Sequence, residues 1–239
     1  MTPVIGKRTV TSNGGRAGEY AGAVQSTGTV LLVHGGLWET IGADWFWRRT
    51  GVIDGLAGRG FTVLAPDRLR QPANWTTEAA HLAAVVARET PPGASVTVLG
   101  GSFGCAAAVR LALDYPGLAG RLVLAWPASL LDRFTAIRIR AELARQRARA
   151  SVLDALLGTE TLPSATDAEL RSLPVPAAVV PSLPPNPLHP RAAVDALLRL
   201  LPSAVELPGS AEAPRPEFSA QRESFLDAVA AFAHPGERP

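Results

Sequence analysis

Lysine and cysteine are almost absent from this sequence. Lys7 is the only lysine and Cys105 the only cysteine among 239 residues. A single cysteine excludes a disulfide within the chain and any metal site built from several cysteines. Histidine is also rare, so a mechanism that needs an imidazole has few candidates, namely His34, His81, His189 and His234.

A large net charge and a long apolar segment are lacking as well. The formal net charge is +2, and charged residues make up 18% of the chain. This balance gives no reason to expect nucleic acid or an anionic membrane as a partner. The first residues lack the apolar core of a signal peptide, and no apolar run approaches the length of a membrane span. We therefore expect a cytoplasmic protein that binds a small molecule and uses neither metal nor cofactor.

The pattern of apolar runs predicts one α/β domain over residues 1–239. Hydrophobic residues make up 47% of the chain, which is enough for a single large core. Strand-like and helix-like segments alternate, which is typical of a mostly parallel sheet with helices on both faces. The expected strands lie near 8–11 and 17–24 and at 29–33, 61–65, 95–99, 122–125, 175–180 and 204–207. The expected helices lie around 47–56, at 77–88 with a cap at 76–78, at 105–114, from 190 onward and at 218–233.

Residues 128–173 interrupt this alternation with a long helical stretch. We interpret the stretch as a small helical cap inserted into the domain. Its arginines then belong to a solvated helix face, and a second interpretation is that they meet an anionic substrate or an acidic carrier protein. These arginines are Arg133, Arg138, Arg140, Arg145, Arg147 and Arg149.

The most informative motif is Gly-Gly-Ser-Phe-Gly at residues 100–104. It follows a predicted strand and begins a run of small, helix-forming residues. A serine placed between strand and helix, with glycine on each side, is typical of a nucleophile elbow. Gly100 and Gly104 let the strand and the helix approach closely, while the serine takes a strained backbone conformation. The motif predicts that Ser102 stands at the apex of this turn as a nucleophile.

The order of these parts resembles the α/β-hydrolase superfamily over nearly the whole chain. One strand ends in His-Gly-Gly at 34–36, the next ends in Ala-Pro-Asp at 65–67, the elbow lies at 100–104, and a cap follows the next strand. The resemblance implies an α/β-hydrolase fold with a small helical cap. It does not fix the chemistry, because the superfamily includes esterases, thioesterases, lyases and members without catalytic activity.

The resemblance also implies an oxyanion hole and a substrate pocket. The backbone N–H of Phe103, with that of Gly36 or Leu37, would stabilise negative charge on a carbonyl oxygen. His34 is expected to brace this loop rather than to take a proton from the serine. A cluster of large aromatic residues either packs under the cap or forms the walls of an apolar pocket. Its members are Trp38, Trp45, Phe46 and Trp47.

The superfamily's order of catalytic residues, serine then acid then histidine, is not followed here. After the strand at 175–180, where the acid is expected, the nearest match is Asn186, and the loop after the last strand contains no histidine. His189 is the best placed of the other histidines, because it lies near the site of the missing acid; its alternative role is structural, at a helix N-terminus. Glu212 or Asp132 would then orient it.

Three functions from different classes fit these observations. The first is a serine hydrolase of small esters, thioesters or lactones with a degenerate triad, in which Ser102 is the nucleophile and His189 a relocated base. The second is a non-hydrolytic catalyst or small-molecule-binding protein on the same fold, which the missing histidine motivates. A third is an interaction protein that uses the arginine-bearing cap.

Overall fold

The computed structural model describes residues 28–38, 41–158 and 161–234. The strands expected near 8–11 and 17–24 lie outside these residues. Within them, all strand pairs of the central sheet are parallel, in the order β2-β1-β3-β4-β5-β6. The strands are β1 (Thr29–Val33), β2 (Thr62–Leu64), β3 (Val96–Gly101), β4 (Ala119–Ala125), β5 (Ala177–Val180) and β6 (Ala204–Glu206). The prediction of a parallel sheet is confirmed.

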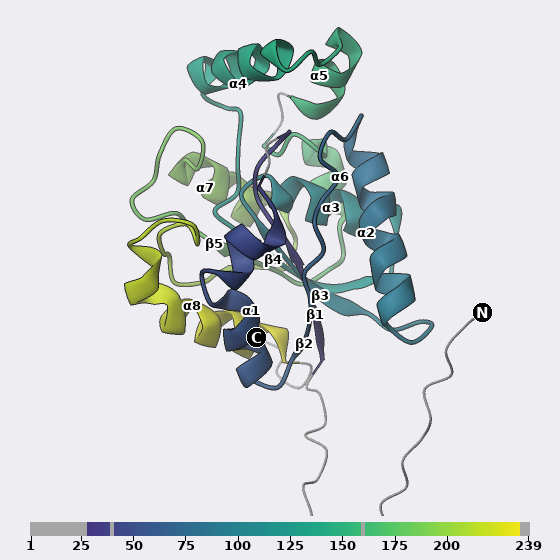
Figure 1. The fold of residues 1–239 in the computed structure, drawn as a ribbon, viewed down its shortest axis with the longest axis vertical. Coiled ribbons are helices and arrows are strands. Elements are labelled where there is room, and N and C mark those ends of the chain that lie inside the picture. Colours follow the sequence, from purple (N-terminus) through teal and green to yellow (C-terminus); the bar gives the residue numbers. More distant parts are fainter. Residues whose placement is uncertain (1–27, 39–40, 159–160, 235–239) are drawn as a thin grey trace, which may run out of the picture.

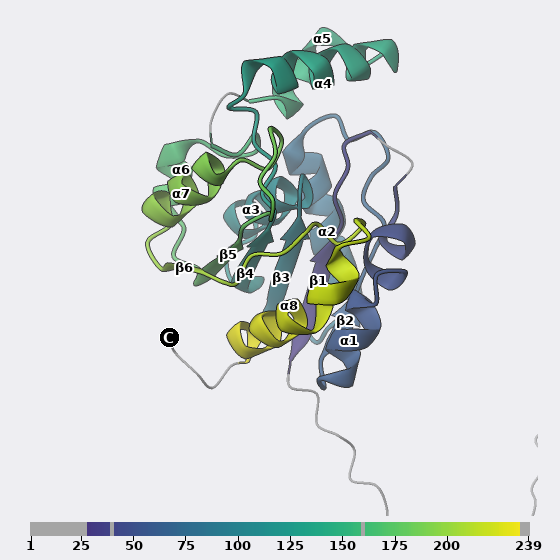
Figure 2. The same ribbon diagram turned by 90° about the vertical axis from the view of Figure 1, so that its left-hand side faces the viewer.

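Helices cover both faces of this sheet (Figures 1 and 2). In chain order they are the short π-helix η1 (Asp44–Arg48), α1 (Val52–Gly58), α2 (Trp75–Glu89), α3 (Gly104–Asp114), α4 (Arg133–Arg145), α5 (Ala150–Leu156), α6 (Asp167–Ser172), α7 (Arg191–Leu200) and α8 (Phe218–Ala233). Helices η1, α1 and α8 pack on one face. Helices α2, α3 and α7 pack on the other face. No helix of the described residues is long and apolar enough to cross a membrane.

Alternation along the strands creates two separate cores. In β1, Leu31 and Val33 pack into the core beneath α2 and α3. The neighbouring Val30 and Leu32 point to the opposite face, into the core beneath α1 and α8. Successive side chains of a strand point to opposite faces, so a strand covered on both faces must be apolar at every position. The continuous apolar run at 29–33 follows directly from this requirement.

Helices α4 and α5 form a layer beyond the ends of the strands (Figure 1). They belong to the stretch that the sequence analysis interpreted as a cap. Asp132 begins α4 by accepting a hydrogen bond from the backbone N–H of Thr135 at 2.7 Å. Helix α6, from the same stretch, lies beside α7 instead (Figure 2).

Two local predictions need correction in detail. The helical region expected around 47–56 is divided into η1 and α1, because the chain turns at Gly51, whose φ of 79° is left-handed. The helix expected at 77–88 begins earlier, at Trp75. Its cap is Asn74 rather than 76–78: the Asn74 side chain accepts a hydrogen bond from the Thr77 N–H at 2.8 Å.

Close approach of β1 and α3 requires glycine at position 104. A Cβ atom there would lie 2.2 Å from the carbonyl oxygen of Val33 and 2.7 Å from that of His34. At Gly58, in contrast, a Cβ atom would have no heavy atom within 4 Å. We expect Gly104→Ala to lower the free energy of unfolding by ~1–3 kcal/mol through overpacking. Gly58→Ala should raise it by up to about 1 kcal/mol, because the unfolded chain loses freedom.

Denaturant-induced unfolding of the two glycine variants beside the unchanged protein checks this pair. Both substitutions add the same methyl group, so they differ only in what surrounds it. Equal shifts of the two midpoints would contradict the close approach at residue 104.

Candidate active site

Ser102 stands in the turn that joins β3 to α3. Its φ of 54° lies in the left-handed region, which a residue with a side chain adopts at a cost of about 1–3 kcal/mol. Two hydrogen bonds hold the turn: the Ser102 N–H donates to the carbonyl of Ala125 at 3.0 Å, and the Cys105 N–H donates to the carbonyl of Ser102 at 3.0 Å. The strained backbone presents the side chain of Ser102 at the carboxyl end of β3, in the turn that the elbow motif predicted.

His189 contacts this serine from the loop between β5 and α7. The Oγ atom of Ser102 lies 2.9 Å from Nε2 of His189. Asn186 fixes the loop, because its Oδ1 accepts hydrogen bonds from the N–H groups of Leu188 and His189 at 3.0 and 3.1 Å. The imidazole is therefore held by its own backbone in a position from which one nitrogen faces the serine.

Glu212 contacts the other nitrogen of the same ring from the loop between β6 and α8. Its Oε1 lies 2.8 Å from Nδ1 of His189. The same oxygen accepts hydrogen bonds from Nδ2 of Asn186 at 2.7 Å and from the hydroxyl of Ser182 at 2.9 Å. Nη1 of Arg215 lies 3.2 Å from the second oxygen, Oε2. Three donors and a cation thus surround a carboxylate that is only 7% exposed.

These contacts keep Glu212 ionised. Burial alone raises the pKa of a carboxyl group, but the hydrogen bonds from His189, from its own backbone N–H and from Ser182 outweigh burial and hold the pKa of Glu212 at about 2. An ionised carboxylate at Nδ1 favours a proton on that nitrogen. Nε2 is then free to accept a hydrogen bond from the hydroxyl of Ser102.

The three side chains open into a pocket of about 390 Å³. Its volume is within the range of small-molecule sites. Trp45 and Phe46 line it, the second of the two roles that the sequence left open, whereas Trp47 is fully buried in the core and does not line it. Trp38 lines a neighbouring hollow of about 300 Å³ on the other side of the 34–36 loop. Besides Trp45 and Phe46, the residues that line the pocket of Ser102 are Gly36, Ile41, Ser102, Phe103, Arg138, Asn186, Leu188, His189, Glu212, Pro214 and Arg215.

The loop after β1 lies against Ser102. A Cβ atom at Gly35 would be 3.0 Å from Cβ of Ser102, so glycine is required for this approach. Within the described part of the chain, the backbone N–H groups of Gly36, Leu37 and Phe103 donate no hydrogen bond. The three residues expected to supply oxyanion donors therefore carry unused N–H groups in the two loops beside the serine.

A buried ion pair braces this loop. Arg68 donates to both carboxylate oxygens of Glu78, from Nε and Nη2, at 2.9 Å each. Its Nη1 donates to the carbonyls of His34 and Gly36 at 3.0 and 2.8 Å. Arg68 is 6% exposed and Glu78 fully buried. Because one guanidinium holds two carbonyls of the loop, it fixes the direction of the peptide groups between them.

His34 adds to this brace and does not approach the serine as a base. Its Nδ1 contacts the carbonyl of Gly35 at 2.8 Å, and its Nε2 accepts the backbone N–H of Arg68 at 2.9 Å. Burial lowers the pKa of His34, which favours the neutral ring that this pair of contacts needs. The sequence offered no signal for the pairing of Arg68 with Glu78, because neither residue lies in a motif.

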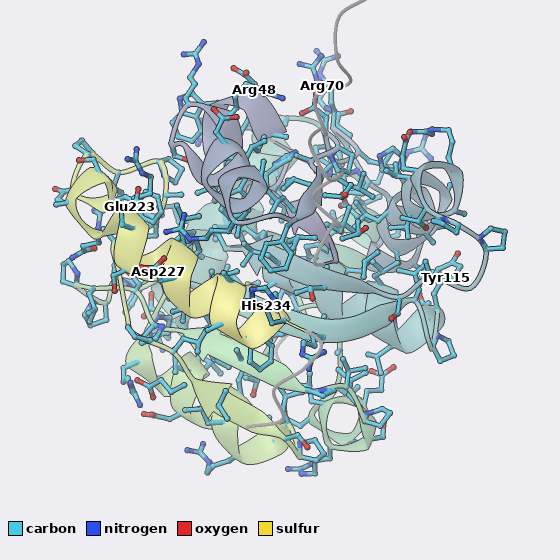
Figure 3. The ribbon with its side chains drawn as sticks, turned by 90° about the horizontal axis from the view of Figure 1, so that it is seen from below. Arg48, Arg70, Tyr115, Glu223, Asp227 and His234 are labelled. Atoms are coloured by element: carbon cyan, nitrogen blue, oxygen red, sulfur yellow. The ribbon has the colours of Figure 1, made fainter. Side chains whose placement is uncertain are left out.

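The other two histidines lie elsewhere. Nε2 of His81, on α2, contacts the carbonyl of Asp67 at 3.0 Å. His234 follows the last residue of α8 and packs on Phe61, with ring centroids 5.1 Å apart. Figure 3 views the molecule from the side opposite α4 and α5 and shows His234 at the C-terminal end of α8. Asp132, the alternative orienting acid, caps α4 instead.

No metal site accompanies these residues. Among the residues that the structure describes, no three histidine, cysteine, aspartate or glutamate side chains are placed to hold a metal ion. Burial raises the pKa of the Cys105 thiol, whose Sγ contacts the carbonyls of Gly100 and Ala125. This thiol lies inside the core, so its chemistry is separate from that of the pocket.

Comparisons with known proteins show the fold. No model of a protein family matches the chain, and no curated protein matches it. Among solved structures, a meta-cleavage product hydrolase from Pseudomonas fluorescens (CumD) is 19% identical, with a TM-score of 0.62 over 86% of this chain and 90% of that chain. NosK from Streptomyces actuosus is 22% identical, with a TM-score of 0.61 over 87% and 99%.

An α/β-hydrolase enzyme from a sediment metagenome is 21% identical, with a TM-score of 0.61 over 84% of this chain and 89% of that chain. Identities this low carry over the architecture and no more. The prediction of the fold class is confirmed: the chain has the α/β-hydrolase fold, with a six-stranded parallel sheet flanked by helices.

Proposed function

We propose that the protein is a serine hydrolase of small esters, thioesters or lactones. Ser102 is the nucleophile, His189 the general base and Glu212 the acid that orients it. The observation that carries the proposal is the pair of contacts through one imidazole, 2.9 Å from Ser102 Oγ to Nε2 and 2.8 Å from Nδ1 to Glu212 Oε1. A serine hydroxyl becomes a useful nucleophile only when a base accepts its proton, and the base needs a partner when it becomes cationic.

In this proposal, the acid and the base have exchanged loops. The superfamily resemblance places the acid after the strand at 175–180 and the histidine after the last strand. Here the loop after β5 carries His189 and the loop after β6 carries Glu212. On this proposal the triad is rearranged rather than incomplete, and the histidine missing after the last strand then gives no separate support for a non-hydrolytic function.

The proposed reaction is an acyl transfer, first to Ser102 and then to water. His189 Nε2 takes the proton of Ser102 as Oγ attacks the substrate carbonyl, and the ionised Glu212 stabilises the imidazolium that forms. The N–H groups of Phe103 and of Gly36 or Leu37 stabilise the negative charge on the carbonyl oxygen. When the carbonyl re-forms, the imidazolium gives its proton to the leaving alcohol or thiol. A water molecule, activated by the same imidazole, then releases the acid from Ser102.

Covalent labelling tests the nucleophile directly. A fluorophosphonate probe should label the unchanged protein, because its phosphorus is attacked by an activated serine. Ser102→Ala should abolish labelling, and His189→Ala should slow it by about 10³-fold or more. Ser219→Ala, on α8 and outside the pocket, serves as the control and should label normally. Labelling that survives in Ser102→Ala, or none at high probe concentration, would overturn the proposal.

The exchanged positions make a second test possible. Glu212→Gln removes the charge beside Nδ1, and we expect kcat for p-nitrophenyl acetate to fall about 10³–10⁴-fold. Adding Asn186→Asp should restore at least tenfold of this loss, because Nδ2 of Asn186 already lies 3.2 Å from Nδ1 of His189. The new carboxylate would then occupy the loop where the superfamily has its acid.

Asn186→Asp alone should lower activity at neutral pH and above. The second carboxylate would lie beside Glu212. Repulsion between the two negative charges raises the pKa of both groups and weakens the contact between Glu212 and Nδ1 of His189. Steady-state kinetics on the three variants provide the measurement. Full activity in Glu212→Gln, or no recovery in a folded double variant, would contradict the assigned role of Glu212.

The Arg68–Glu78 pair is expected to position the oxyanion donors. Arg68→Met should destabilise the protein by about 3–5 kcal/mol, because Glu78 is left buried and unpaired. Arg68→Met with Glu78→Leu removes both charges and should regain most of this stability. The double variant still lacks the donors to the carbonyls of His34 and Gly36, so its kcat should remain about 10²-fold low with KM little changed.

Thermal unfolding and kinetics on the same samples separate the two effects of this pair. Stability is expected to return in the double variant, whereas kcat is not. A double variant that regains both would show that the ion pair serves only the fold.

A further inference from the structure

One charged side chain of the cap reaches the pocket that holds Ser102. Arg138, on α4, is part of its lining, together with Ser102, His189 and Glu212. The rest of the wall is largely apolar and includes Ile41, Trp45, Phe46, Leu188 and Pro214. Helix α4 lies in the layer beyond the strand ends (Figures 1 and 2), so Arg138, an exposed residue, lines the pocket from that side.

The charges of the other ionisable groups in this wall are already paired. Glu212 holds His189 through Oε1 and Arg215 through Oε2, at 2.8 and 3.2 Å. Arg138, in contrast, makes no hydrogen bond or ion pair with the residues that the structure describes. The hydrogen bonds of Thr135 do most to lower the pKa of Asp132, which caps α4, and the charge of Arg138 adds the least to this lowering.

Neighbouring arginines of α4 have structural roles that Arg138 lacks. Arg140 pairs with Asp154 of α5 at 2.6 Å and thereby joins the two cap helices. Arg145 pairs with Glu142 one turn earlier on the same helix. Arg133 stacks on the ring of Phe134, 4.9 Å from its centroid. Arg138 is thus an exposed, unpaired cation in a pocket that holds Ser102 and several apolar side chains, and the other charges of that pocket are already paired.

We propose that Arg138 binds an anionic group on the acyl part of the substrate, so that the natural substrate is an ester or thioester of an acid that carries a second carboxylate. The proposal rests on the proposed hydrolase function and specifies its substrate class. A guanidinium presents two parallel N–H donors that match a carboxylate, and apolar walls strengthen that contact. The pocket of about 390 Å³ has room for a short acyl chain that joins the two carbonyl carbons.

Paired substrates of equal chain length test this inference. Mono-p-nitrophenyl adipate carries a free carboxylate, and p-nitrophenyl hexanoate is its neutral counterpart. We expect kcat/KM to favour the adipate ester, and Arg138→Gln to lower that value about tenfold or more. The value for the hexanoate ester should change by less than about twofold, because the variant loses only the contact with the anion. Release that persists in Ser102→Ala is subtracted as background.

Arg133→Gln is the matched control. It removes the same charge from the same helix, at a side chain that does not line the pocket. It should leave both substrates unaffected. An equal loss in Arg133→Gln would assign the effect to the overall charge of the cap, as expected for docking of an acidic carrier protein, and would overturn a specific contact with Arg138. No preference for adipate, or equal losses on both esters in Arg138→Gln, would also overturn it.

A binding measurement separates this inference from the hydrolase function. Calorimetric titration of the Ser102→Ala protein with monomethyl adipate and with methyl hexanoate requires no turnover. We expect monomethyl adipate to bind more tightly than methyl hexanoate, and its affinity to fall about tenfold when Arg138→Gln is added. This result supports the anion site even if neither p-nitrophenyl ester is hydrolysed. Turnover of the hexanoate ester without preferential binding of the anion leaves the hydrolase standing and removes the anion site.

Discussion

The carboxylate of Glu212 is the contact on which the geometry of the pocket depends. One of its oxygens accepts hydrogen bonds from His189, Asn186 and Ser182, which all belong to the loop after β5. The carboxylate itself belongs to the loop after β6. These bonds therefore join two loops. Between the described residues of these loops, the only β-bridge is the isolated one that pairs Ser182 with Ser210. Charge-assisted bonds of this kind are stronger than neutral ones, and burial keeps water from competing with them.

The opposite wall of the pocket is held by a second buried charge. Arg68 spans from Glu78 on α2 to the carbonyls of His34 and Gly36, so a helix on one face of the sheet fixes the loop at the end of β1. A buried ion pair adds little net stability against apolar residues of the same size, because both charges are desolvated. Its benefit here is directional: each donor points at a particular carbonyl and so fixes the peptide groups of the loop beside Ser102.

Much of the fold could be predicted from the sequence, because the spacing of apolar residues along the chain indicates which positions are buried. The apolar run at 29–33 and the helix at 218–233 were predicted with their observed bounds. The turn at Gly51 was missed, since nothing in its neighbours signals a left-handed residue. Ser102 was identified because an elbow is a local motif. The contact between His189 and Glu212 is long-range, and the sequence left Glu212 and Asp132 as equal alternatives; only the packing of two loops distinguishes them.

In the proposed triad, acid and base have exchanged loops, and this arrangement would show which features of a triad are strict. The mechanism requires that one imidazole nitrogen face the serine and the other face a carboxylate, and this requirement concerns distances rather than chain order. The ends of β5 and β6 are adjacent in the sheet, so either loop can supply the ring and the other the carboxylate. The loop after β5 keeps an amide, Asn186, that bonds to both partners. A neutral amide there avoids placing a second negative charge beside Glu212, so asparagine fits this arrangement better than the aspartate that the superfamily pattern leads one to expect.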